Sequence, residues 1–207
     1  MPENLPVNPW LAMWIKPRAT IRSIISYDAR HRFLTLCALY GLPLVFQIAQ
    51  NMALGYSYSL VGIILGTIFL ALFAGMVGIT IATAVIYVTG KWIGGKGSFI
   101  QVRSAIAWSN VTNIVTIALW IVLIAYFRHE LFTDTFTTAP FTQRESMMVM
   151  GIFLAQTAMS IWSLVLLVQS LAEVQGFSAA RSVLNLLLSG GVIIACFWLV
   201  GLLMAQG

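Results

Sequence analysis

Long runs without charge divide this chain into apolar segments. Four runs contain no Asp, Glu, Lys or Arg: residues 33–90, 104–127, 146–172 and 182–207. A helix that crosses the roughly 30 Å hydrocarbon core of a bilayer needs about 20 apolar residues. Each shorter run therefore predicts one helix, and the first run predicts two helices joined near Gly55–Ser59. The predicted spans are Phe33–Ala53, Leu60–Val88, Ala105–Phe127, Met147–Leu171 and Ser182–Ala205.

The composition agrees with a membrane protein and excludes a soluble enzyme or a disordered chain. Apolar residues make up 60% and charged residues 8% of the 207 positions, against about 45–50% and about 25% in soluble domains. The apolar runs are continuous rather than alternating, which excludes a transmembrane β-barrel. We therefore predict an all-α integral membrane protein with two parts, a cytoplasmic interfacial segment (1–32) and a five-helix transmembrane bundle (33–207).

Lysine and arginine are distributed unequally between the two predicted sides of the membrane. The side that holds the N-terminus and the second and fourth loops carries nine of these residues, and the opposite side carries two. This excess predicts a cytoplasmic N-terminus and an external C-terminus in a multi-pass membrane protein. The first 32 residues lack the apolar core of a secretory signal, so we expect the first span to act as an uncleaved anchor.

The segment before the first span has the pattern of an amphipathic helix. Asn8-Pro9 is a typical helix start, and Lys16-Pro17 should interrupt that helix and begin another. Beyond Pro17, Ile21, Ile24 and Ile25 form one apolar stripe, with basic residues elsewhere. A basic amphipathic helix lies in a membrane interface. It would either anchor the bundle against anionic lipid or present a surface to a specific partner.

Several short motifs resemble the bacterial branch of the Yip (Ypt/Rab-interacting protein) domain family. These motifs are Asn8–Trp10, Ile15–Arg18, Ile21–Ile24, Gly94–Phe99 and Ala107–Asn110. The resemblance covers nearly the whole chain and implies a five-helix bundle with a cytoplasmic N-terminus, in the bacterial cytoplasmic (inner) membrane. Eukaryotic relatives bind Rab-type GTPases in vesicle traffic, but the Asp-Leu-Tyr-Gly-Pro block that they carry before the first helix is absent here. GTPase binding is therefore not carried over to this chain. Some bacterial relatives are linked to transporters or envelope stress.

The predicted spans lack the residues that intramembrane catalysis requires. No Asp, Glu, Lys or Arg lies deep in a span, and the two histidines, His31 and His129, fall at opposite faces. Cys37 and Cys196 fall in different predicted spans, which favours small core-like thiols over a disulfide or a metal pair. The glycine-rich stretch 90–97 lacks the full phosphate-loop pattern and a preceding strand. We expect no enzymatic activity, no cofactor, no metal and no nucleic-acid partner.

Amide and hydroxyl side chains supply most of the polarity within the spans. The candidate intramembrane polar cluster comprises Ser109, Asn110, Asn113 and Gln156. Such groups usually form hydrogen bonds between helices, and the alternative is a polar cavity for a lipid headgroup or a small solute. Gly62 and Gly66 have the spacing of closely packed helices, either within one chain or between two copies. The oligomeric state stays open.

Two functions fit this pattern. The first is a non-enzymatic scaffold or adaptor, whose basic cytoplasmic face contacts membrane lipid or a membrane-protein partner such as a transporter or an envelope-related complex. Its candidate contacts are Trp10, Trp14, Arg18, Arg22, Lys91, Lys96 and Arg103. The alternative is a small transporter or lipid-handling protein with a cavity between its helices.

Overall fold

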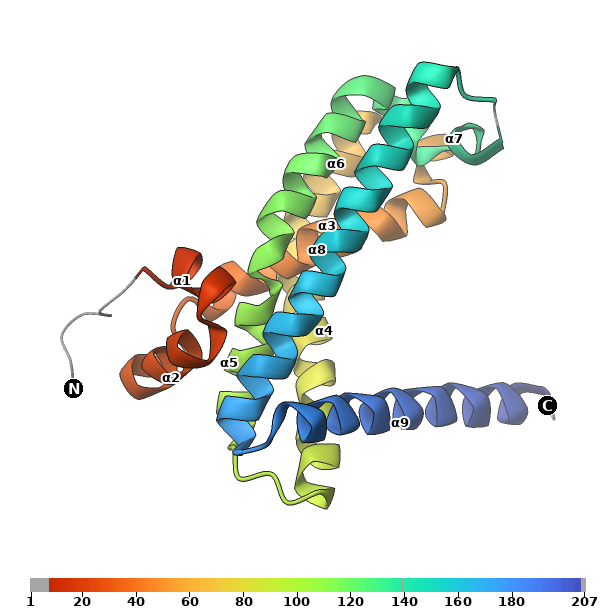
Figure 1. The fold of residues 1–207 in the computed structure, drawn as a ribbon. Helices are drawn as coiled ribbons and strands as arrows, with labels where there is room; N and C mark the ends of the chain where they lie inside the picture. The colour runs from red at the N-terminus through yellow and green to blue at the C-terminus, as the bar shows by residue number, and fades with distance from the viewer. Residues whose placement is uncertain (1–7, 139, 206–207) are drawn as a thin grey trace. The chain divides into compact units, whose positions relative to one another are not determined.

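The computed structural model describes residues 8–138 and 140–205, and within them every regular element is a helix (Figure 1). Five helical stretches of the described chain are long and apolar enough to cross a membrane, which confirms the predicted all-α membrane fold. The elements are α1 (Pro9–Ile15), α2 (Pro17–Asp28), α3 (Phe33–Asn51), η1 (Leu54–Tyr56), α4 (Leu60–Trp92), α5 (Phe99–Ser109), η2 (Asn110–Thr112), α6 (Asn113–Phe127), η3 (Arg128–Phe132), α7 (Thr135–Thr138), α8 (Gln143–Gln175) and α9 (Ala179–Ala205).

The third predicted span is not one helix from Ala105 to Phe127. It begins earlier, at Phe99, because Ser98 and Gln101 form a capping box: the Ser98 amide donates to Gln101 Oε1 at 2.9 Å, and the Gln101 amide donates to Ser98 Oγ at 3.4 Å. A 3₁₀ turn over Asn110–Thr112 then separates α5 from α6. Short polar side chains compete with helical backbone hydrogen bonds, so this break lies where such residues concentrate.

Helices α4 and α8 are longer than predicted. Each has 33 residues, which corresponds to about 50 Å of helix, whereas the hydrocarbon core is roughly 30 Å thick. If each crosses once, its terminal turns lie among the lipid headgroups or beyond them. The charged and amide side chains near the end of α8 can therefore stay hydrated.

The residues group into two compact units, each built from separate stretches of the chain. Unit 1 contains residues 1–31, 79–109 and 166–207, and unit 2 contains residues 32–78 and 110–165. Unit 2 has an aromatic core in which the Phe46 ring lies 5.4 Å from Trp120 and 6.1 Å from Phe132. All three side chains are buried.

Glycines of unit 2 bring α3 and α4 into backbone contact. A Cβ atom added to Gly41 would lie 1.8 Å from the Ala71 carbonyl oxygen, and one added to Gly75 would lie 1.8 Å from that of Cys37. Gly66, in contrast, faces open space. Close packing of α3 against α4 therefore does not require a glycine at position 66. The backbone contact between these helices forms at Gly41 and Gly75 instead.

In unit 1, the amphipathic helix α2 packs against protein. Its breaks are as predicted, since the Asn8 side chain caps α1 and Lys16 separates α1 from α2. Ile21 and Ile24 are fully buried, and α2 contacts α5. The apolar stripe thus attaches α2 to the bundle, which leaves the basic residues of α2 to face outward.

Candidate functional site

The end of α4 is a tight glycine-stabilised turn. Gly94 has a φ of +85°, a conformation that glycine adopts without strain. The Gly95 amide donates to the Gly90 carbonyl at 2.8 Å, and the Gly94 amide donates to the Lys91 carbonyl at 3.1 Å. These two bonds form a Schellman motif. The Lys91 ammonium closes the turn further by donating to the Gly95 carbonyl at 3.0 Å.

The end of α8 repeats this arrangement. Gly176 has a φ of +70°, and the Phe177 amide donates to the Ala172 carbonyl at 2.8 Å, as in a Schellman motif. Phe177 and Ala172 are both buried, which supplies the apolar contact that usually accompanies the motif. The chain therefore turns sharply between α8 and α9.

Gln175 joins these two turns. Its carbonyl accepts a hydrogen bond of 3.1 Å from the Lys96 amide. Its side chain, 2% exposed, lies between two glycines: a Cβ atom on Gly90 would be 2.1 Å from Gln175 Oε1, and one on Gly95 would be 2.2 Å from it. Gly97 packs in the same way against Val174. The lysine-bearing loop after α4 is therefore held against the end of α8.

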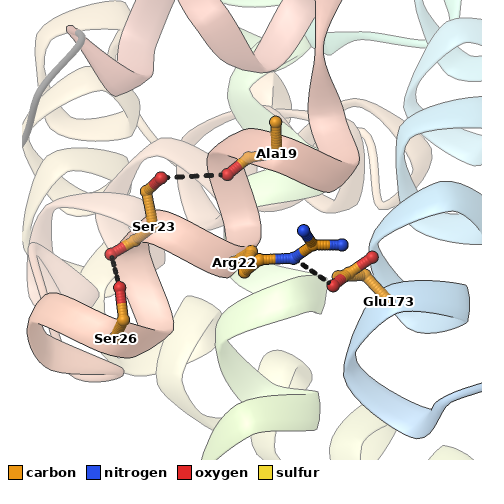
Figure 2. A network of polar contacts seen from close by, with 5 residues as sticks. All are labelled: Ala19, Arg22, Ser23, Ser26 and Glu173. Atoms are coloured by element: carbon orange, nitrogen blue, oxygen red, sulfur yellow. Dashed lines mark hydrogen bonds and ion pairs between the residues drawn. The ribbon is translucent and has the colours of Figure 1, made fainter.

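Helix α2 is attached to the same end of α8 by two parallel contacts. Arg18 Nε donates to Gln169 Oε1, and Arg22 Nε donates to Glu173 Oε1, each at 2.6 Å. Both arginines and both acceptors are four residues apart, so the contacts repeat at one helical turn. Figure 2 shows the Arg22–Glu173 pair between the two helices. We call these four residues the arginine ladder.

The Arg22–Glu173 pair lies at the surface of unit 1. The Arg22 side chain is 72% exposed and that of Glu173 is 19% exposed. The hydrogen bond and negative charge of Glu173 hold the pKa of Arg22 above its ordinary value. Arg22 therefore stays charged while most of its side chain remains accessible.

A small cleft, lined by both polar and apolar side chains, opens beside this pair. It has a volume of about 230 Å³ and lies among α2, α5 and α8, lined by Arg22, Ile25, Ser26, Gln101, Glu173 and Val174. The Ser26 hydroxyl donates to the Ser23 carbonyl at 2.9 Å (Figure 2). Gln101 Oε1 accepts from the Ser98 amide, so the NH₂ group of Gln101 can donate to a ligand.

The other predicted surface residues differ in exposure. Trp10 is half-buried, with its ring 5.1 Å from that of Trp108, and Trp14 is also half-buried. Lys96 is exposed, whereas Arg103 is half-buried. The tryptophans thus contribute to packing, and the accessible charge comes from the exposed bases Arg18, Arg22, Lys91 and Lys96. We define the basic face as Arg18, Arg22, Lys91, Lys96 and Arg103.

The predicted intramembrane polar residues fall in both units. Ser109 belongs to unit 1, and the other three belong to unit 2. The Ser109 hydroxyl donates to the Ile106 carbonyl of its own helix at 2.8 Å. The Gln156 carbonyl accepts a bond of 2.9 Å from the Ser160 hydroxyl, one turn later in α8. Their role as one cluster, with Asn110 and Asn113, stays a prediction.

A buried polar cluster between α4 and α9 was not among the predicted sites. Thr89 Oγ1 lies 2.7 Å from both Asn185 Oδ1 and Ser189 Oγ, and Asn185 Nδ2 donates to the Ile86 carbonyl at 3.3 Å. Asn185 is fully buried. Ser182, Asn185 and Ser189 have helical spacing along one face, and this pattern could have identified the α9 side of the contact.

A family model for the Yip1 domain matches residues 11–200. This match covers most of the chain, including the arginine ladder and the loop after α4. The chain belongs to the Yip1 domain family. Searches of curated proteins and of solved structures gave no match.

Membership agrees with the helices described above: this Yip1 domain protein is a membrane protein with several apolar helices. Within the described residues, no group of three or more His, Cys, Asp or Glu side chains could hold a metal ion.

Proposed function

We propose that this protein is a non-enzymatic membrane scaffold whose basic face binds anionic lipid or an acidic surface of a membrane partner. The observation that carries this proposal is the attachment of two basic elements to one helix end. Gln175 holds the loop that contains Lys96, and Glu173 holds Arg22. Charges distant in the sequence are thereby positioned together on unit 1.

The balance of charge supports this function. The basic face has five bases, whereas the ladder contributes one acid, Glu173. Each base near an anionic membrane surface contributes about 1 kcal/mol of attraction at physiological salt. Exposed charges are screened over about 8–10 Å, so the attraction acts on a headgroup or acidic segment close to the face.

The proposal places the basic face in the cytoplasm, as the lysine and arginine count predicts. An alkaline phosphatase domain, active only after export, tests this orientation. We expect activity when the domain is fused after Gly207 and none when it is inserted near Gly97. The reverse pattern, or equal activity at both positions, would contradict the orientation.

The function itself can be tested by neutralising the basic face. The triple variant Lys91→Gln, Lys96→Gln and Arg103→Gln should insert into membranes normally but retain less phosphatidylglycerol and fewer acidic partners on purification in mild detergent. The difference from the parent should shrink as salt rises, because screening weakens the parent's attraction. Arg128→Gln with Arg144→Gln is the matched control. Unchanged retention in the triple variant, with loss in the control, would refute the proposal.

A cleft in unit 2 favours the lipid-handling alternative. It has a volume of about 400 Å³ and an almost wholly apolar lining between the end of α3 and the start of α4, formed by Val45, Ile48, Ala49, Met52, Leu54, Tyr58, Gly62, Ile63, Gly66, Thr67 and Leu70. An acyl chain is the matching ligand. The alternative requires that added phospholipid raises the thermal stability of the purified protein, and that Gly66→Leu, which fills the cleft, abolishes this increase.

A further inference from the structure

The arginine ladder fixes two guanidinium groups one helical turn apart. Arg18 and Arg22 each use Nε to reach an acceptor on α8, at 2.6 Å. A guanidinium has five N–H donors in a rigid plane, so each Nε bond leaves four terminal donors for a ligand. Planar pairs of such donors match the oxygens of a phosphate group. The ladder thus orients the guanidiniums in addition to supplying charge.

The ladder also lies at the right depth for a lipid phosphate. Gln169 and Glu173 occupy the last two turns of α8, a helix of about 50 Å in a bilayer of about 40–45 Å including its headgroups. Helix α2 ends shortly before the first apolar span begins at Phe33. Both sides of the ladder therefore approach the headgroup layer.

The adjoining cleft supplies space and another donor. Its volume of about 230 Å³ has room for roughly seven or eight groups the size of a water molecule, at about 30 Å³ each. A phosphate with a short headgroup has this size. Gln101 and Arg22 both line this cleft, so α2 and α5 each bring a side chain with N–H donors to it.

We propose that Arg22 and Gln101 bind the phosphate group of a membrane phospholipid, that Arg18 adds charge one turn away, and that Glu173 is a positioning residue that holds the Arg22 guanidinium. This inference rests on the proposed function, since both place lipid at the basic face. It adds a defined site to what would otherwise be diffuse attraction.

Glu173 allows orientation to be separated from charge. Glu173→Ala and Glu173→Gln raise the net charge equally, but only glutamine keeps an oxygen that can accept from Arg22 Nε, as Gln169 does for Arg18. The purified full-length protein in detergent is titrated with dihexanoyl phosphatidylglycerol, a soluble phospholipid. We expect Glu173→Ala to bind it roughly tenfold more weakly than Glu173→Gln, the equivalent of about 1.4 kcal/mol. Equal binding by the two variants would overturn the proposal.

A second pair of variants tests the arginines without changing charge. Arg18→Lys with Arg22→Lys should lose most of the binding, because lysine is a point charge without the guanidinium plane, whereas Arg30→Lys with Arg32→Lys should retain it. Parent-like binding by the ladder variant would refute the site. Inorganic phosphate serves as the competing ligand. If it displaces the phospholipid at equal concentration, the site is not specific for a lipid and the proposal of a lipid site is refuted.

The outcomes separate the site from the broader function. If neutralising Lys91, Lys96 and Arg103 weakens retention but the two Glu173 variants behave alike, the scaffold function stands and the phosphate site is wrong. If the Glu173 variants differ but the triple variant retains lipid and partners as the parent does, the general role of the basic face is wrong.

Discussion

Gly90 and Gln175 form a contact whose energy can be measured by substitution. A Cβ atom at Gly90 would lie 2.1 Å from Gln175 Oε1 and 2.9 Å from Cδ and Nε2 of the same side chain. An amide at the tip of an exposed side chain would move aside, but this one is 2% exposed and has Gly95 on its other side. Gly90→Ala must therefore overpack the junction between the loop and α8.

The size of the effect follows from two opposing terms. Overpacking costs roughly 1–3 kcal/mol, whereas replacing a helical glycine by alanine stabilises a helix by about 0.5–1 kcal/mol. We expect Gly90→Ala to lower the free energy of unfolding by about 1–2 kcal/mol in the parent. In a Gln175→Ala background the clash is absent, so the same substitution should be neutral or stabilising. The sign of the effect should thus depend on one side chain.

The assay is a double-mutant cycle on the detergent-solubilised protein, with unfolding followed in mixed micelles of increasing denaturing detergent. The cycle should give an interaction energy of about 2 kcal/mol. Gly151→Ala is the matched control, since a Cβ atom added to this helical glycine would meet nothing within 4 Å beyond its own helix backbone. Equal destabilisation by Gly90→Ala in both backgrounds, or stabilisation in the parent, would refute the proposed clash between the added methyl group and the Gln175 side chain.

Three further outcomes test the packing and electrostatics. Asn185→Ala should lower the free energy of unfolding by about 1 kcal/mol, because hydrogen bonds between membrane helices contribute about 0.6 kcal/mol each. If a double-mutant cycle with Thr89→Val gives no interaction energy, the buried hydrogen bond between these two residues is contradicted. Gly75→Ala should lower the free energy of unfolding by about 3 kcal/mol, the upper end of the cost of overpacking, because the added Cβ would meet rigid backbone. A parent-like melting temperature of this variant would refute the prediction. The hydrogen bond from Tyr56 to Asp134 raises the Tyr56 pKa above the ordinary value. Its stabilisation is therefore present below the ordinary tyrosine pKa and is lost as pH rises through the raised one. The difference in phenolate absorbance between the parent and Tyr56→Phe should show this shift, and it should disappear in Asp134→Ala, which removes the acceptor.

The sequence by itself determined the features that depend on local physics. A bilayer excludes charge and unpaired backbone groups, so uncharged runs were enough to predict an all-α membrane fold with five spans. Local rules also predicted the break between α1 and α2, because Pro17 acts on its immediate neighbours. The third span was wrong in its limits: the Ser98–Gln101 capping box that starts α5 is a local signal that the hydropathy pattern overlooked, and the 3₁₀ turn at Asn110–Thr112 interrupts an otherwise apolar run.

Only the tertiary structure decided which residues meet across the chain. Arg18 and Arg22 were expected to contact lipid or a partner, but their acceptors on α8 are 151 positions away, and nothing in either segment specifies the other. Gln175 carried no signal at all, because its role comes from two glycines that leave room for its amide. Long-range contacts of this kind depend on shape and register once the helices pack. The charge pattern could therefore identify the basic face, whereas the side chains that hold it in place required the fold.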